Sequence, residues 1–482
     1  MTLFLALAAL IGTAPCSPAT GDAHSLLVSA ATATGLPSVA SRALHVTGFD
    51  VVSQDFQSDR MYPPFLSTVD SFDTWFSPAT GVERTSSHSI VAGNDYGGPT
   101  GIGSAGASYV VRDTGLVPSE DIHASLYVTR PLNVWAMLDD WLASPNVRVV
   151  GRCDYRDYPR LVLSRAGPRG EERLFLNQQT HIPVKLERTE PHYLWGQVHV
   201  DYVYSTWQRL DDVYVPGVSH RLVDGRTTIE RVFGSIKLLP SDSAPSLALP
   251  AMATAMGYPV PAFLTPSAPD TIRVSANIYL LKNPGYAETV MLARDTVYVL
   301  DATQGDARAR QDSAWIAKLF PGRHPIVVVV TDLAWPHVAG VRYWVAHGAT
   351  IVSHTAGRSF LESVVARRWT EAPDLLERRR ATARLHFIGV SDSLRLAGGD
   401  LLLFAIDGRT SEVALAAYSR PDAFLWASDF IQTLREPSAY LDDVWHATQR
   451  AHVEPSRVAA EHLRLSPWDA VARLAEPQPK PH

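Results

Sequence analysis

A proline-rich stretch in the middle of the chain most strongly constrains how this sequence can fold. Seven prolines occur there among serines and alanines: Pro240, Pro245, Pro250, Pro259, Pro261, Pro266 and Pro269. Because proline fixes φ and lacks a backbone N–H, this density prevents a continuous helix or a central strand. We therefore predict a Pro-rich linker over residues 241–270, with a domain on each side, residues 25–240 and residues 271–482.

Length and charge limit the classes of protein that this chain can belong to. With 482 residues, each predicted domain is long enough to bury a core of its own. The 43 Lys and Arg against 49 Asp and Glu give a net charge of −6, with both signs spread along the chain. A basic footprint for nucleic acid is therefore absent, and we expect no nucleic-acid partner.

The first residues of the chain indicate export. An apolar run, Met1–Ile11, is followed by small residues and a polar stretch that ends near His24. The run is too short to cross a membrane, and no later segment reaches 18 apolar residues, so we expect no transmembrane span. We predict a signal peptide over residues 1–24 and a periplasmic or extracellular protein, although no Lys or Arg precedes Arg42. The alternative is an ordinary buried N-terminal helix.

The chain contains only two cysteines, Cys16 and Cys153. From this number we predict that no disulfide framework supports the fold. Cys153 lies in an expected strand between Arg152 and Asp154 and is predicted to be an inert thiol. The sequence before Cys16, Thr13-Ala-Pro, is a poor lipidation signal and leaves open whether Cys16 carries a lipid.

Alternating and β-branched segments dominate the first half of the chain. Ser108–Arg112, Arg160–Ser164 and Gly196–Tyr204 are predicted strands, and Pro131–Leu142 has the apolar spacing of a helix. The order of segments from Gln179 to Gly225 resembles periplasmic half-barrel proteins of the lipoprotein-carrier kind. That resemblance implies a curved antiparallel sheet around an apolar groove for a small-molecule or lipid-like ligand. The alternative is a meander stabilised by aromatic side chains.

The second half alternates strands and helices. We predict strands over 276–281, 289–293 and 296–301, a helix over 307–320, and a further strand, Ile326–Val330. The last of these is entirely apolar, which is typical of a strand buried on both faces. It runs directly into Thr331-Asp-Leu-Ala-Trp-Pro-His337-Val-Ala-Gly340.

This strand and loop, followed by a new helix, resemble the metallo-β-lactamase-fold hydrolase superfamily. Val413–Tyr418 and Phe424–Asp429 resemble the strand pair that ends in the bridging aspartate of that superfamily, and Val458–Trp468 resembles the closing strand with its last histidine ligand. The resemblance implies an αββα sandwich over residues 271–482. Together with the β-rich first half, it implies an α+β chain of two domains.

The resemblance also implies an eroded metal site. The His-x-His-x-Asp-His positions of the superfamily fall on Asp332, Ala334, Pro336 and His337, and a further histidine position falls on Thr410. The first zinc would lose all three of its histidines, so we do not expect two zinc ions. The second zinc would keep three ligands, His337, Asp429 and His462. Trp335 is expected at the mouth of the cleft.

Two functions therefore remain open. The chain is either a non-catalytic binding or scaffolding member of this superfamily, or a hydrolase with a single zinc. Two imidazoles and one carboxylate suffice to hold a catalytic zinc with one open position for water. In the second case the site would use His337, Asp429 and His462 to activate water on an ester, an amide or a phosphoester.

Overall fold

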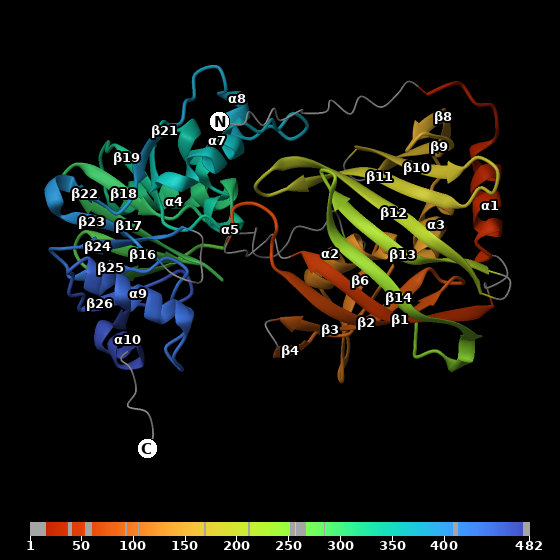
Figure 1. Ribbon diagram of the computed structural model, residues 1–482, viewed down its shortest axis with the longest axis horizontal. Helices are drawn as coiled ribbons and strands as arrows, with labels where there is room; N and C mark the ends of the chain where they lie inside the picture. Colours follow the sequence, from red (N-terminus) through yellow and green to blue (C-terminus); the bar gives the residue numbers. More distant parts are fainter. Residues whose placement is uncertain are drawn as a thin grey trace, which may run out of the picture. The chain divides into compact units, whose positions relative to one another are not determined.

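The structure is a computed structural model of the chain, and it divides into two compact units (Figure 1). It describes residues 16–36, 41–53, 60–91, 94–104, 106–167, 170–210, 213–250, 256, 267–283, 285–407 and 413–475. Unit 1 comprises Met1–Ser53, Ser67–Glu190 and Val198–Pro259, and unit 2 comprises Gln54–Leu66, Pro191–Gln197 and Val260–His482. Two short segments from the first half of the chain are therefore part of unit 2.

A 14-stranded sheet forms the framework of unit 1. Its strands are β1 (Arg42–Ser53), β2 (Ser67–Ser77), β3 (Val82–Val91), β4 (Asn94–Gly97), β5 (Gly101–Gly103), β6 (Ser108–Arg112), β7 (Gly115–Pro118), β8 (Arg148–Tyr155), β9 (Tyr158–Gly167), β10 (Gly170–Asn177), β11 (Pro183–His192), β12 (Gly196–Leu210), β13 (Val213–Val223) and β14 (Arg226–Pro240). The order across the sheet is β7-β6-β5-β3-β2-β1-β14-β13-β12-β11-β10-β9-β8, and β4 pairs with β3. The first strand thus pairs with the last, β14, in antiparallel register.

The α-helices of the described part of unit 1 are α1 (Ala23–Ala33), α2 (Glu120–Thr129) and α3 (Val134–Leu142). Helix α2 packs on β5 and β6, and α1 packs on α3. The predicted helix over 131–142 is present, but its α-helical part begins at Val134. The reason is that the Asn133 side chain accepts a hydrogen bond from the backbone N–H of Trp135 at 3.2 Å and caps the helix there.

The interior of unit 1 contains charged side chains. Glu190 accepts hydrogen bonds from Arg188 Nε at 2.7 Å and from Arg221 Nη2 at 2.6 Å. A cavity of about 170 Å³ near these groups is lined by Arg130, Asp140, Arg165, Glu172 and Arg188 among other residues. The lining of this cavity therefore combines charged side chains with apolar ones such as Leu126 and Pro131.

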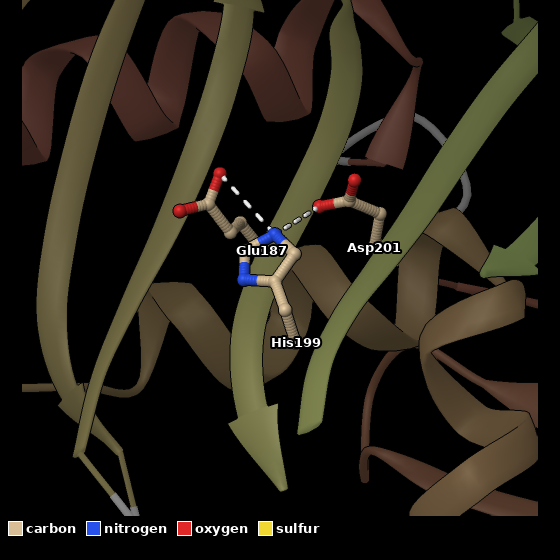
Figure 2. Close-up of side chains that lie close together, drawn as sticks. All are labelled: Glu187, His199 and Asp201. Atoms are coloured by element: carbon tan, nitrogen blue, oxygen red, sulfur yellow. Dashed lines mark hydrogen bonds and ion pairs between the residues drawn. The ribbon is translucent and has the colours of Figure 1, made fainter. Parts of the chain in front are cut away.

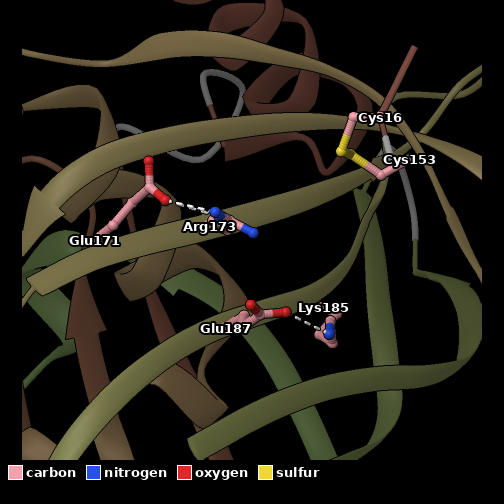
Figure 3. Close-up of a disulfide and its surroundings, with 6 residues drawn as sticks. All are labelled: Cys16, Cys153, Glu171, Arg173, Lys185 and Glu187. Carbon is pink, nitrogen blue, oxygen red and sulfur yellow. Dashed lines mark hydrogen bonds and ion pairs between the residues drawn. A yellow bond between two sulfur atoms is a disulfide. The ribbon is translucent and has the colours of Figure 1, made fainter. Parts of the chain in front are cut away.

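The two cysteines form a disulfide, so the predictions of an inert Cys153 thiol and of a fold without disulfide support are both wrong (Figure 3). Backbone hydrogen bonds of 2.8 Å in both directions between Ser17 and Arg152 bring Cys16 next to strand β8. The pair is separated by 137 residues, and a contact of that range leaves no periodic signal in the sequence. Residues 1–15 of the predicted signal peptide lie outside the described residues. Residues 16–24 belong to the folded chain, since α1 begins at Ala23.

Unit 2 contains two sheets. The first has seven strands in the order of the sequence: β15 (Asp270–Arg273), β16 (Ile278–Lys282), β17 (Ala287–Ala293), β18 (Thr296–Leu300), β19 (Ile326–Val330), β20 (Thr350–His354) and β21 (His386–Val390). The second has six: β22 (Ser393–Leu396), β23 (Leu401–Ala405), β24 (Leu415–Ser419), β25 (Phe424–Trp426), β26 (Arg457–Ala459) and β27 (Ser466–Pro467). The prediction of a β-rich chain with several sheets is confirmed.

Helices cover the outer faces of these two sheets (Figure 1). Those with the first sheet are α4 (Asp306–Leu319), α5 (Trp335–Val338), α6 (Val341–Ala346), α7 (Arg358–Ala366) and α8 (Leu375–Arg378). Those with the second sheet are α9 (Ala439–Arg450) and α10 (Trp468–Ala475). No helix in the described part of the chain is long and apolar enough to cross a membrane.

Strand β19 shows why an entirely apolar segment suits this layering. Side chains alternate between the two faces of a strand. Val328 and Val330 accordingly join the core under the helices, while Val329 joins the core between the two sheets. Both faces of β19 are thus buried, and each valine side chain contributes roughly 1.5–3 kcal/mol through the apolar surface that it removes from water.

Candidate metal centre

Four side chains meet where strands of the two sheets of unit 2 end. His337 lies on α5, which follows β19, and Asp429 lies in the loop after β25. Glu461 and His462 follow β26, which runs parallel to β25. Because neighbouring parallel strands end at the same edge, the segments after β25 and β26 lie side by side, and the Glu461 N–H donates to the Ser428 carbonyl at 2.9 Å.

His337 is the centre of this group. Its Nε2 atom lies 3.1 Å from Glu461 Oε2 and 3.8 Å from Asp429 Oδ2. Its Nδ1 atom lies 3.4 Å from Asp332 Oδ1, and His462 Nε2 lies 3.1 Å from Asp429 Oδ1. The donor atoms of His337, Asp429 and Glu461 all lie within 4.8 Å of one another, a spacing that could hold one metal ion.

Burial differs across the group. The side chains of His337 and Glu461 are fully buried, whereas those of Asp429 and His462 are 21% and 22% exposed. Within these four side chains, solvent therefore reaches Asp429 and His462 but not His337 or Glu461.

The buried atoms of the group lack hydrogen bonds. Within the described residues, neither ring nitrogen of His337 and neither carboxylate oxygen of Glu461 has a hydrogen-bond partner of acceptable geometry. Leaving a buried polar group unpaired costs roughly 1–3 kcal/mol, and more for a charged group. The His337 Nε2 and Glu461 Oε2 atoms lie 3.1 Å apart without hydrogen-bond geometry, and a metal ion held by both side chains would satisfy them.

The electrostatics of the group are dominated by carboxylates. Burial raises the pKa of Glu461 well above its ordinary value, and the negative charges of Asp301, Asp429, Asp332 and Glu288 add to that rise. Burial by itself would lower the pKa of His337, but Asp332, Asp429 and Asp301 raise it to about 9. His337 is therefore protonated at neutral pH in the metal-free chain, and binding of a metal would have to release that proton.

Asp301 fixes the start of the loop that carries Asp332 and His337. Its Oδ1 atom accepts hydrogen bonds from the backbone N–H and the hydroxyl of Thr331, at 2.7 and 2.8 Å. Its Oδ2 atom accepts one from Trp426 Nε1, on β25, at 2.7 Å. Burial raises the pKa of Asp301 to about 6, against the effect of these hydrogen bonds. One buried carboxylate thus ties β25 to the loop after β19.

Trp335 contacts an aromatic cluster of unit 2. Its ring lies edge-on to Phe65, Trp195 and His192, with ring centroids 5.3, 5.4 and 5.5 Å away. Its Nε1 atom donates to the Met61 carbonyl at 3.3 Å, and only 4% of the residue is exposed. The ring is thus buried under segments 60–66 and 191–197, a position that the sequence could not predict.

The structure brings the three sequence-predicted ligands, His337, Asp429 and His462, into one group. His462 contacts Asp429 but is not among the three residues whose donor atoms lie within 4.8 Å of one another. Thr410 lies outside the described residues. Glu461 was missed by sequence reasoning, although an acidic residue after the apolar run Val458-Ala-Ala was a signal that could have identified it.

A second group of possible ligands lies on strands β11 and β12 of unit 1. Figure 2 shows Glu187, His199 and Asp201 together, with His199 Nε2 3.1 Å from Asp201 Oδ1 and 3.9 Å from Glu187 Oε2. The Lys185 ammonium lies 2.8 Å from Glu187 and 3.3 Å from Asp201 (Figure 3 shows the first of these pairs). The ammonium group of Lys185 therefore already compensates both carboxylates.

Comparisons with known proteins complete this description. No protein-family model matches the chain, and no curated protein matches its sequence. Solved structures of metallo-β-lactamases do match. DIM-1 is 13% identical, with 44% of this chain and 96% of that chain covered and a TM-score of 0.35. The enzyme from Hirschia baltica is 11% identical, with 43% and 97% covered and a TM-score of 0.34.

A third match is FIM-1 from Pseudomonas aeruginosa, described in its mono-zinc form. It is 11% identical, with 44% of this chain and 94% of that chain covered and a TM-score of 0.35. Likenesses at this level assign neither a family nor an activity, so the site has to be judged from its own residues.

Proposed function

We propose that unit 2 binds one divalent metal ion through His337, Asp429 and Glu461, and that the protein is an exported, non-catalytic binding module with a metallo-β-lactamase-like fold. The observation that carries the proposal is the buried pair of His337 and Glu461, whose four polar side-chain atoms have no hydrogen-bond partner among the described residues. One imidazole and two carboxylates are ligands that suit zinc. His462 contacts Asp429 and would position it, in the way that outer residues commonly orient a ligand.

The residues present fit a single ion better than two. At the superfamily positions of the first ion stand Asp332, Ala334 and Thr410, as the sequence resemblance implies. Asp332 contacts His337 Nδ1, the ring nitrogen facing away from Glu461. When bound, the ion supplies positive charge that compensates the buried carboxylates, and Lewis acidity toward a water or substrate oxygen.

The burial of Trp335 and His337 supports the proposal that the module is non-catalytic. His337 and Glu461 are inaccessible, and Trp335 is packed under Phe65, His192 and Trp195. A substrate would have to approach past Asp429 and His462. An ion held in this way stabilises the fold of unit 2, and any ligand of the module would bind elsewhere on it.

Metal analysis of the untagged protein tests the metal site. We expect about one equivalent of zinc, removed by a chelator, because the three ligands form one site. At a metal concentration of 100 times Kd the expected stabilisation is about 2.7 kcal/mol. For a unit of this size that raises Tm by about 5–10 °C.

Matched variants separate the proposed site from the second histidine–carboxylate group. Glu461→Gln is expected to lose the metal and its Tm increment, whereas His199→Gln keeps both. Protein that binds no metal, or a Glu461→Gln variant that binds it as tightly as the wild type, would contradict the proposal.

A hydrolase with a single metal is the second candidate. The observation that favours it is the partial exposure of Asp429 and His462, which leaves one side of the site open to solvent. The test is turnover of nitrophenyl esters, anilides and phosphodiesters by the zinc-loaded protein. Hydrolysis by the wild type that disappears in both Glu461→Gln and His462→Ala would establish this candidate and overturn the non-catalytic one.

Export is supported by the disulfide, because disulfides persist in oxidising compartments. The disulfide also limits where a signal peptide could be cleaved, because removal of residues 1–24 would remove Cys16 and the first residues of α1. We therefore propose that any signal peptide is cleaved before Cys16 and that this residue carries no lipid. The mass of the mature N-terminal peptide, measured without reduction, tests both statements. An N-terminus after Cys16, or a lipid on it, would overturn them.

A further inference from the structure

A groove on the outer face of the second sheet of unit 2 carries an inference that does not depend on the metal centre. The groove has a volume of about 330 Å³ and is lined by β22, β23, the residue after β24, and the C-terminal end of α9. Figure 1 labels these elements in the C-terminal part of the chain. Its volume falls within the range of about 300–1,000 Å³ that is typical of small-molecule sites.

The register between β22 and β23 determines which of their side chains line the groove. Ser393 pairs with Phe404, and Arg395 pairs with Leu402, so these four side chains stand on one face of β22 and β23. Leu402 and Phe404 are buried in the core beneath α9 and form an apolar floor, together with Ala447 of α9. The side chains of Ser393 and Arg395 are exposed beside this floor.

Three arginines line the groove: Arg395, Arg420 and Arg450. The side chains of Arg395 and Arg420 form no hydrogen bond or ion pair with any described residue. Among the described residues, Arg450 has one long contact, 3.7 Å from its Nη2 atom to Asp407 Oδ2, and the two side chains are 49% and 79% exposed. Asp392 and Asp407 are the acidic residues of the lining, which leaves an excess of one positive charge.

We propose that this groove binds a small organic oxyanion, a phosphate or carboxylate group on an apolar body. Guanidinium groups bind such oxyanions with two parallel hydrogen bonds, and Arg395 and Arg420 have their donors available for this. The apolar body would lie on Leu402 and Phe404. The combination of free guanidinium groups with an apolar floor distinguishes the groove from an ordinary solvated basic surface.

Calorimetric titration with phenyl phosphate tests the proposal, with a chelator present so that no metal site binds the anion. We expect saturable binding that is tighter than that of inorganic phosphate, because only phenyl phosphate covers the floor. Benzoate is expected to bind as well, whereas benzyl alcohol, which lacks the oxyanion, is not. Benzyl alcohol binding as tightly as phenyl phosphate, or no saturable binding of either oxyanion, would overturn the proposal.

Substitutions assign the binding to the groove. Arg395→Gln and Arg420→Gln are each expected to weaken phenyl phosphate binding about tenfold or more, the usual effect of losing a charge-assisted hydrogen bond. Arg473→Gln, on α10 and outside the lining, is the matched control and is expected to bind like the wild type. All three arginines are exposed, so Tm is expected to stay unchanged and to show that each variant folds. Wild-type affinity in both groove variants would refute the assignment.

Discussion

The disulfide between Cys16 and Cys153 allows a stability prediction whose size follows from the structure. The folded chain keeps Ser17 and Arg152 hydrogen-bonded on both sides, so reduction removes little from the native state itself. The main effect is on the unfolded chain, where the bond closes a loop spanning 137 residues. The chain-entropy relation gives about 5 kcal/mol for a loop of this length. We expect reduction to lower the free energy of unfolding of unit 1 by up to that amount.

Urea unfolding of oxidised and reduced protein, followed by tryptophan fluorescence, measures this difference. Unit 1 contains Trp75, Trp135, Trp141 and Trp207, of which Trp135 and Trp141 are buried on α3. The control is the double variant Cys16→Ser/Cys153→Ser, which should unfold like the reduced wild type and ignore the reductant. Identical unfolding midpoints for oxidised and reduced wild type would refute the reasoning, as would free thiols in protein recovered from an oxidising compartment.

Three further predictions concern buried charge and backbone. Burial by itself would raise the pKa of Glu190, but Arg188 and Arg221 lower it to about 2 from 4.5. The ionised Glu190 side chain thus contributes about 3 kcal/mol to the free energy of unfolding above pH 4.5, and this contribution is lost as the pH falls toward 2. In urea unfolding measured at a series of pH values, the Glu190→Gln variant should show a smaller loss of stability between pH 4.5 and 2. Arg342 donates hydrogen bonds to Asp374 Oδ2 at 2.6 Å and to the Arg367 carbonyl at 2.8 Å. Because Arg342→Met leaves the buried Asp374 without its partner, urea unfolding should show a free energy of unfolding lower by about 3–5 kcal/mol. Gly196 has a φ of +71°, and a Cβ atom there would lie 2.4 Å from the Trp369 ring. Gly196→Ala should therefore lower the free energy of unfolding by at least about 1–2 kcal/mol. An unchanged Tm in this variant would contradict the prediction.

Local pattern was sufficient for the elements that bury an apolar face. Ile326–Val330 was predicted as a strand buried on both faces and is β19 with the same bounds, because alternation and β-branching act within a few residues. The helix predicted over 307–320 is α4, shifted by one residue to Asp306–Leu319. Such features depend on periodicity, which the sequence displays directly.

The candidate site was only partly predictable. The resemblance of several segments to the metallo-β-lactamase-fold superfamily pointed to His337, Asp429 and His462. Glu461 escaped because spacing does not tell which of two adjacent side chains enters the interior after a strand ends. Its role depends on β25 and β26 pairing in parallel, a contact between segments more than 30 residues apart.

From the sequence alone, composition and short-range periodicity indicated the β-rich character and predicted the linker, and the resemblance to the superfamily pointed to His337, Asp429 and His462. Tertiary structure alone decided the disulfide, the burial of Trp335 beneath Phe65 and Trp195, and the pairing of His337 with Glu461. Each of these joins residues more than 100 positions apart. Such contacts form when strand pairing and core packing bring distant segments together, and no local preference of the chain encodes them.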